Sequence, residues 1–133
     1  MGKTPCRDRM VAGVRADVGM EVADHVETAH VQVTTTVDEQ TAARDLARSA
    51  VEARLAACGQ VTSRIRSIYR WNGEVVEADE WMVTFKTTAA RFAALAEHVR
   101  ERHPYEVPEI LATPIVDGDP AYLAWIATET NSV

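Results

Sequence analysis

The stretch at residues 61–87, VTSRIRSIYRWNGEVVEADEWMVTFKT, decides how this chain folds. At its centre stands Asn72-Gly73, a strong signal for a two-residue hairpin turn, because a type I′ turn needs positive φ at both central positions. Apolar and polar residues alternate on both sides of the turn, as in strands with one buried face. We therefore predict a long antiparallel hairpin, with apolar positions at Val61, Ile65, Tyr69 and Trp71 on the first strand and at Trp81, Val83 and Phe85 on the second.

The register of this hairpin contains a conflict. If Trp71 pairs with Glu74 across the turn, Arg64 falls opposite Trp81, so an apolar face meets a polar one. Either a β-bulge resets the register, or both faces are buried, which requires a second layer such as another subunit. The aromatic area of such a long ribbon also favours an oligomer. Cross-strand ion pairs are expected between Arg64, Arg66 and Arg70 on one strand and Glu77, Asp79 and Glu80 on the other.

A strand and a helix precede the hairpin. HVQVTTTV at residues 30–37 alternates valine with polar and β-branched residues, which predicts a strand. DEQTAARDLARSAVEARLAAC then shows the apolar spacing of an amphipathic helix. We expect this helix to start at a capping box from Thr36 to Glu39, or at Asp38. Its expected end is Gly59, directly after a small buried Cys58.

Two helices and a short strand follow the hairpin. Thr87 or Thr88 is expected to cap a helix that ends before Pro104, because proline disfavours α geometry at the preceding residue. The stretch ILATPIV predicts a short strand, and Asp119-Pro120 predicts the start of a last helix. The expected apolar anchors are Phe92, Leu95, Ala96 and Val99 in the first helix and Tyr122, Leu123, Trp125 and Ile126 in the last.

The order of elements is therefore β-α-β-β-α-β with an extra C-terminal helix. This is an α+β, ferredoxin-like arrangement, in which a four-stranded antiparallel sheet carries two helices on one face. The open face needs a cover, and a trimer is one way to supply it. Residues 1–29 mix charges with glycine and alanine, so we interpret them as a disordered arm before a domain at 30–133.

Composition excludes several classes of protein. The chain has 133 residues, a net charge of -6 and a pI of about 5.2, which argues against nucleic-acid binding. No apolar run approaches the ~20 residues that span a bilayer, and the first thirty residues lack the apolar core of a signal peptide. Two cysteines, Cys6 and Cys58, make no disulfide framework. A cytoplasmic protein with free thiols is expected.

The segment HPYEVPEI at residues 103–110 gathers a histidine, a tyrosine, two glutamates and two prolines. It is interpreted either as shaped backbone leading into the last strand, or as a ligand or metal site using His103, Glu106 or Glu109. An extended chain would hold His103 and Glu109 roughly 20 Å apart, too far for one metal unless the segment bends sharply. No GxGxxG, P-loop or CxxC pattern accompanies it, so no enzyme is predicted.

The pieces DEQTAARDLARSAVEARLAAC, SIYRWNGEV, KTT, HPYEVPEI and GDPAYLAWI together resemble the CutA family of divalent-cation tolerance proteins. The resemblance implies a ferredoxin-like fold, a tight homotrimer similar in architecture to PII signalling proteins, and tolerance of copper and other divalent ions. Copper-binding members carry a cysteine late in the first strand and a histidine pair before the PY motif. This chain has Thr34 or Thr35 and Arg102-His103 there. Weak copper binding through His103 and Glu109, on different subunits, is the resulting expectation, with no other cofactor.

A second class of function remains open. The chain would then be a trimeric signalling or interaction module that binds a small anionic ligand in the clefts between subunits. Arginines of the hairpin would attract the anion, although cross-strand ion pairs are their plainer role. The residues expected to line such a cleft or a subunit interface are Tyr69, Arg70, Trp71, Tyr105 and Glu106.

Overall fold

The computed structural model describes residues 29–131. Its strands are β1 (His30–Val37), β2 (Cys58–Val61), β3 (Ile65–Trp71), β4 (Glu74–Thr88) and β5 (Leu111–Pro114). Its helices are α2 (Gln40–Glu52), α3 (Phe92–Arg102) and α4 (Pro120–Glu129), with a short 3₁₀ turn, η2 (Ala89–Arg91), before α3. In this part of the chain no helix is long and apolar enough to cross a membrane.

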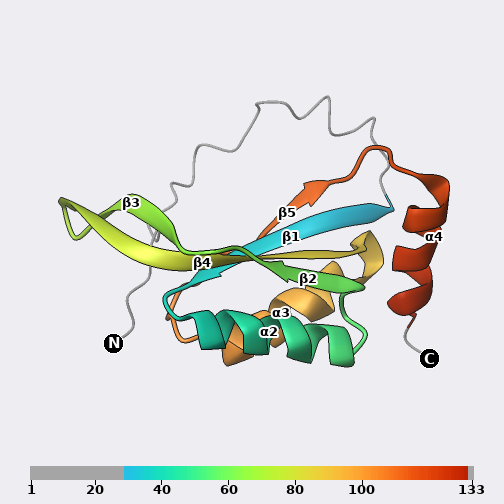
Figure 1. Ribbon diagram of the computed structural model, residues 1–133, viewed down its shortest axis with the longest axis horizontal. Coiled ribbons are helices and arrows are strands. Elements are labelled where there is room, and N and C mark those ends of the chain that lie inside the picture. The colour runs from blue at the N-terminus through green and yellow to red at the C-terminus, as the bar shows by residue number, and fades with distance from the viewer. Residues whose placement is uncertain (1–28, 132–133) are drawn as a thin grey trace.

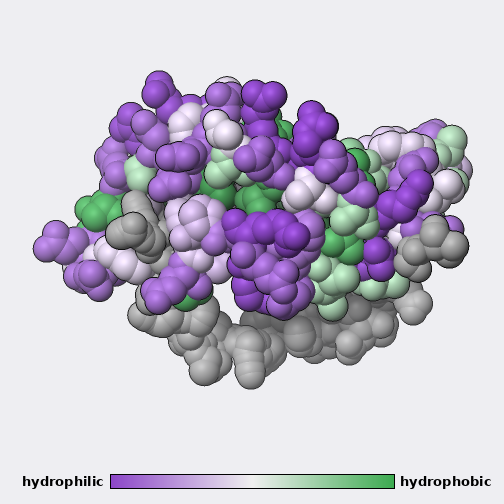
Figure 2. All heavy atoms as spheres, turned by 90° about the horizontal axis from the view of Figure 1, so that it is seen from below, coloured by the Kyte–Doolittle hydropathy of each residue, from purple (hydrophilic) through white to green (hydrophobic). Residues whose placement is uncertain are grey.

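The strands form one antiparallel sheet in the order β2-β4-β1-β5. Strand β3 pairs with the first half of β4, from Glu74 to Glu80. Helices α2 and α3 lie on one face, α4 stands at one end, and the β3–β4 hairpin extends beyond the other end (Figure 1). The outer side of the two helices is mostly hydrophilic (Figure 2). The predicted α+β class and antiparallel sheet are confirmed.

The core lies between the sheet and the two helices. Strand β1 buries Val33 and Val37, and the neighbouring β4 buries Val83 and Phe85. Their side chains meet small residues of α2 together with Leu95 and Val99 of α3. Burying each of these side chains contributes about 1.5–3 kcal/mol to folding. For this reason the apolar alternation in the strands and the apolar stripe of the helices predicted the core well.

A β-bulge resolves the predicted register conflict. Trp71 pairs with Glu74 and Ile65 with Glu80, whereas Val61 pairs with Val83. Three residues, 62–64, therefore oppose two, 81 and 82, and one extra residue divides the predicted first hairpin strand into β2 and β3. Thr62 secures the bulge, since its backbone N–H donates to the Met82 carbonyl at 3.0 Å and its hydroxyl accepts from the Met82 N–H at 3.0 Å.

The predicted boundaries of α2 are wrong at both ends. It begins at Gln40 with Glu39 at the N-cap, and no side chain supplies a cap hydrogen bond. It ends at Glu52, and Cys58 and Gly59 belong to β2. Gly59 serves close packing, because a Cβ there would lie 2.9 Å from the Cβ of Ala47.

Of the predicted starts of the two later helices, the one at Asp119 is confirmed and the one at Thr87 or Thr88 is wrong. Neither Thr87 nor Thr88 caps α3 through its side chain; Thr88 precedes the 3₁₀ turn instead. Asp119 does cap α4, accepting a hydrogen bond from the Tyr122 N–H at 3.2 Å. Of the four predicted anchors of α4, only Ile126 is fully buried.

Candidate functional site

The HPYEVPEI segment closes over the end of β1. Pro104 forces the preceding residue, His103, out of the helix and into an extended conformation with φ -79° and ψ 139°. The chain then bends through residues 104–107 before it reaches β5. The segment therefore folds back instead of running straight, so His103 and Glu109 are not held apart as they would be in an extended chain.

The ring of His103 is buried and uses both of its nitrogens. Nδ1 accepts the backbone N–H of Tyr105 at 3.1 Å, and Nε2 lies 2.9 Å from the carbonyl oxygen of Thr36. Because a backbone N–H can only donate and a carbonyl can only accept, the proton of the neutral ring sits on Nε2. Burial lowers the pKa of His103, against the opposing effect of the Thr36 carbonyl, and so favours this neutral form.

Tyr105 and Glu80 form the most deeply buried polar contact of the site. The Tyr105 hydroxyl donates to Oε2 of Glu80 at 2.7 Å, and the two residues are 5% and 1% exposed. Burial, followed by the bond to Glu80, raises the pKa of Tyr105 far above its ordinary value, so the hydroxyl keeps its proton. The His103 ring packs against Tyr105 with centroids 4.7 Å apart.

The burial of Glu80 corrects one prediction. Glu80 was expected among the carboxylates paired with hairpin arginines, but it faces Tyr105. Two of the three arginines form the predicted ion pairs, on the other face of the hairpin, while Arg70 has no ion pair within residues 29–131. Arg66 contacts Asp79 at 3.0 Å and Glu77 at 3.1 Å. Arg64 also reaches Asp79, at 3.8 Å.

Glu109 completes the cluster. Burial, and then the negative charge of Glu80, raise the pKa of Glu109. The Thr36 hydroxyl lies near this carboxyl and acts in the opposite sense, but the two groups do not form a hydrogen bond. His103 and Glu109 thus approach the same residue of β1, one at its carbonyl and the other at its side chain. The cluster formed by His103, Tyr105, Glu109, Glu80 and Thr36 is called the junction cluster below.

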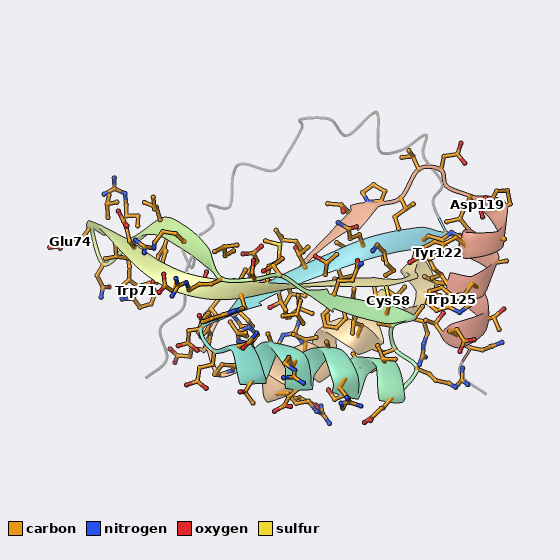
Figure 3. The ribbon with its side chains drawn as sticks, in the orientation of Figure 1. Cys58, Trp71, Glu74, Asp119, Tyr122 and Trp125 are labelled. Atoms are coloured by element: carbon orange, nitrogen blue, oxygen red, sulfur yellow. The ribbon has the colours of Figure 1, made fainter. Side chains whose placement is uncertain are left out.

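The predicted cleft residues are only partly brought together. Tyr69 lies close enough to Tyr105 to influence its pKa. Arg70 is on the opposite face of the hairpin and donates to the Gly73 carbonyl at 3.4 Å. Trp71 lies near the hairpin tip beside Glu74 (Figure 3), and Glu106 is exposed.

Two features of the site were missed in the sequence. Glu80 follows Val76 and Ala78 at the two-residue spacing of one strand face, and this pattern could have identified a buried carboxylate. The second feature is a groove of about 560 Å³ between α2 and the edge strand β2. No sequence pattern predicts this groove, because its shape depends on how the helix packs on the sheet. It is lined by Thr41, Arg44, Asp45, Ala47, Arg48, Val51, Glu52, Gly59 and Val61.

The cluster's chemistry is acid–base and hydrogen bonding. Within residues 29–131, no group of three or more histidine, cysteine, aspartate or glutamate side chains is placed to hold a metal ion. The donors also fit copper poorly, because the only lone pair of the neutral His103 ring already accepts a hydrogen bond. Any ion at His103 must first displace a contact of the fold.

Comparisons with known proteins cover nearly all of the described chain. Residues 31–129 match the family model described as CutA1 divalent ion tolerance protein. The chain is 47% identical over 96 residues to the divalent-cation tolerance protein CutA of Thermus thermophilus, covering 72% of this chain and 93% of that protein. It is 43% identical to Protein CutA of Mus musculus over 98 residues, which is 74% of this chain but 55% of the mouse protein.

Solved structures agree with the sequence matches. The structure of Cut A1 from Thermus thermophilus superposes with a TM-score of 0.75 at 45% identity, covering 77% of this chain and 99% of that one. The names of other relatives point to different compartments, chloroplastic in Arabidopsis thaliana and periplasmic in Archaeoglobus fulgidus. The cytoplasmic location expected from the sequence therefore stays a prediction.

Proposed function

Because this chain belongs to the CutA1 divalent ion tolerance protein family, we propose that it supports tolerance of divalent cations, copper among them, as a non-catalytic trimer. The observation that carries this proposal is the extent of the family match, which runs from Val31 to Glu129 and includes the whole junction cluster. Tolerance proteins of this family are not enzymes. Ion binding and assembly are therefore the properties to test.

The trimer is supported by surfaces that a single chain leaves open. The sheet ends in two short edge strands, β2 and β5, whose outer backbone groups have no partner strand in the described residues. The projecting hairpin also exposes 64% of Ile68 and 63% of Val75, and β5 exposes 56% of Leu111. Exposed apolar side chains on open edges are typical of surfaces that pair with another copy.

Ion binding is proposed to be weak and to use His103 and Glu109, which the fold of a single chain brings to the same residue of β1, so the second subunit expected for an extended segment is not required. Thr34 and Arg102 supply poor copper ligands where other family members have a cysteine and a histidine. The half-buried carboxylate of Glu109 is the remaining anionic donor, and a cation would relieve its repulsion from Glu80. The low affinity follows from the cost of breaking the contacts of His103.

Copper(II) titration by calorimetry tests this ion site, using the full chain and measuring its mass in solution. Saturable binding that is at least tenfold weaker in His103→Ala, with the mass unchanged, is the expected result. His98→Ala is the matched control, because His98 is a half-buried histidine outside the cluster that contacts Ser49 at 2.8 Å. Equal binding by wild type and His103→Ala, or none by either, would remove the ion site from the proposal.

Assembly is tested by Ile68→Glu. Ile68 is so exposed that a charge there costs a single chain little, but it would be buried unpaired in a subunit interface. We expect a shift from trimer toward monomer in sedimentation equilibrium. The control, Ala93→Glu on the exposed side of α3, should leave the mass unchanged. A monomeric wild type would refute the trimer.

A second candidate function is a trimeric interaction module that binds a small anion. It is favoured by the groove between α2 and β2, where Arg44 has no ion pair within residues 29–131 and Arg48 contacts only Glu52, at 3.7 Å. The hairpin arginines are less suitable, because Arg64 and Arg66 are already paired. Saturable binding of inorganic phosphate that is lost in Arg44→Ala, with copper not bound, would favour this alternative.

A further inference from the structure

Glu80 carries a buried carboxylate that no positively charged side chain of the described fold compensates. Its side chain is 1% exposed, and its hydrogen-bond donor, the Tyr105 hydroxyl, is a neutral group. None of the ion pairs among residues 29–131 includes Glu80. Because a carboxylate without a counter-charge is costly to remove from water, buried carboxylates are normally paired with a cationic side chain or bound to a metal ion.

The strand register places two further oxygen groups beside this carboxylate. Thr36 of β1 pairs with Met82 of β4, so Glu80, two residues away on the same strand face, is its diagonal neighbour at about 7–8 Å between backbones. Strand β5 pairs with β1, and continuing that register by two residues puts Glu109 directly opposite Thr36. Glu80 and Glu109 therefore flank Thr36 on the sheet face that lies away from α2 and α3.

The hydroxyl of Thr36 is unsatisfied at the centre of this group. Thr36 is 3% exposed, and its hydroxyl has no hydrogen-bonding partner within the described residues. Burial and then the charge of Glu80 raise the pKa of Glu109, and the nearby Thr36 hydroxyl opposes them. A buried hydroxyl oxygen between two carboxylates that repel each other is an arrangement that a bound cation would satisfy in all three members.

The available donors are oxygen atoms. The neighbouring His103 offers no nitrogen, because its Nδ1 accepts the Tyr105 N–H and its Nε2 donates to the Thr36 carbonyl. Oxygen ligands suit Mg²⁺, Mn²⁺ and Ca²⁺, whereas copper prefers nitrogen and sulfur. Within residues 29–131 no three histidine, cysteine, aspartate or glutamate side chains converge, but Mg²⁺ commonly takes one or two carboxylates and keeps several waters.

We propose that the carboxylates of Glu80 and Glu109 and the hydroxyl of Thr36 bind a hard divalent cation of the Mg²⁺ or Mn²⁺ type, with water as the remaining ligands. This inference rests on the proposed role in divalent-cation tolerance and names the class of ion. It adds two ligands, Glu80 and Thr36, and requires no nitrogen of His103. Tyr105 acts as a positioning residue, because its hydroxyl holds one oxygen of Glu80.

Electron paramagnetic resonance of Mn²⁺ with the full chain tests this site, because the sharp signal of aqueous Mn²⁺ is lost when the ion binds. Wild type should bind Mn²⁺ saturably, and excess Mg²⁺ should displace it. Glu80→Gln should weaken Mn²⁺ binding by about tenfold or more, while its amide oxygen still accepts from Tyr105 and preserves the fold. The matched control is Glu77→Gln, an exposed carboxylate on the other face of β4, which should bind Mn²⁺ as wild type does.

Thr36→Val separates ion binding from folding. The Thr36 hydroxyl has no partner in the described fold, so its removal should not lower stability in urea denaturation. The same variant should nevertheless bind Mn²⁺ more weakly than wild type. An undiminished aqueous Mn²⁺ signal with wild type would overturn the inference, and so would Mn²⁺ binding that survives both Glu80→Gln and Thr36→Val.

The copper titration keeps this inference separate from the proposed copper site. Copper binding that is lost in His103→Ala, with no Mn²⁺ binding, would overturn the hard-cation site and leave the copper site standing. Mn²⁺ binding that is lost in Glu80→Gln and retained in His103→Ala, with no copper binding, would establish the reverse. Binding of neither ion would remove both sites.

Discussion

At the scale of single residues, β1 shows how one hydroxyl can oppose the packing around it. Val31, Val33, Thr35 and Val37 share the strand face that is buried against the helices. Thr35 is 0% exposed, and its hydroxyl meets no hydrogen-bonding partner within the described residues. A buried, unsatisfied hydroxyl costs about 1–3 kcal/mol, so threonine is a poor choice in this row of valines.

Replacing Thr35 with valine should therefore stabilise the protein. Thr35→Val keeps the shape of the side chain and removes the unsatisfied group, so the free energy of unfolding should rise by about 1 kcal/mol. Urea denaturation at a fixed protomer concentration measures this change, since the stability of any protein that assembles depends on its concentration. The control, Thr34→Val on the opposite and less buried face, should change stability by less than about 0.5 kcal/mol. A destabilised Thr35→Val would show that the hydroxyl has a hydrogen-bonding partner outside residues 29–131.

At the scale of elements, the end of α2 depends on an unusual residue. The Leu55 N–H bonds to the Ala50 carbonyl and the Arg54 N–H to the Val51 carbonyl, both at 3.0 Å, which is the Schellman pattern. Glycine normally occupies the left-handed position, but here Arg54 does, with φ 61°. Its side chain reaches α4, donating to the Glu129 carbonyl at 3.1 Å.

The backbone strain at Arg54 can be measured by comparing two substitutions. Arg54→Ala and Arg54→Gly both lose the contact with Glu129, so their difference reports the left-handed backbone alone. Arg54→Gly should be the more stable of the two by about 1 kcal/mol in urea denaturation. At Ala53, where φ is an ordinary -84°, substitution by glycine should instead lower stability by roughly 0.5–1 kcal/mol. Equal stability of the two Arg54 variants would contradict the strain.

The accuracy of sequence-based prediction also differs by element. Strand alternation placed β1 and the hairpin, and Asp119-Pro120 placed the start of α4, because these signals are local. The end of α2 was misplaced because Gly59 was taken as its cap, whereas the glycine is needed for contact with Ala47. The bulge at Thr62 was only one of two alternatives, since the choice depends on which face of each strand the tertiary packing buries.

At the scale of the whole molecule, the junction cluster couples three distant parts of the chain. Thr36 comes from β1, Glu80 from β4, and His103, Tyr105 and Glu109 from the segment before β5. The sequence singled out His103 and Glu109 as candidate metal ligands and placed Tyr105 separately, among the residues expected to line a cleft or interface. It could not predict that Glu80 joins them, because a strand pattern does not say which segment will cover a given face.

The cluster makes stability depend on pH. Burial lowers the pKa of His103 and of His98 in the folded protein. Each histidine therefore contributes stability that is fully present above its unfolded pKa of about 6.5. This stability is lost as the pH falls from that value through the lower pKa of the folded state. Between pH 7.5 and 5.5 we expect the free energy of unfolding to decrease. His103→Gln should decrease less steeply than wild type, as measured by urea denaturation across this range. An unchanged slope would show that His103 does not titrate with unfolding.

Glu109 contributes with the opposite sign. Its raised pKa means that the folded state binds a proton more tightly, so protonation stabilises the fold as the pH falls toward about 4.5. Glu109→Gln should remove this compensation, leaving the protein more stable near neutral pH and its acid-side decline steeper.

The central position of β4 has a consequence for synthesis. This 15-residue strand pairs with β1, β2 and β3, so β1 has no neighbour on that side until β4 has left the ribosome. At roughly 5–20 residues per second, the ~50 residues between the ends of β1 and β4 take several seconds to translate. During that interval the nascent segment HVQVTTTV is an unpaired, uncharged and β-branched strand, the kind that self-associates. Cellular yield should therefore respond to translation speed and to chaperones that hold extended segments.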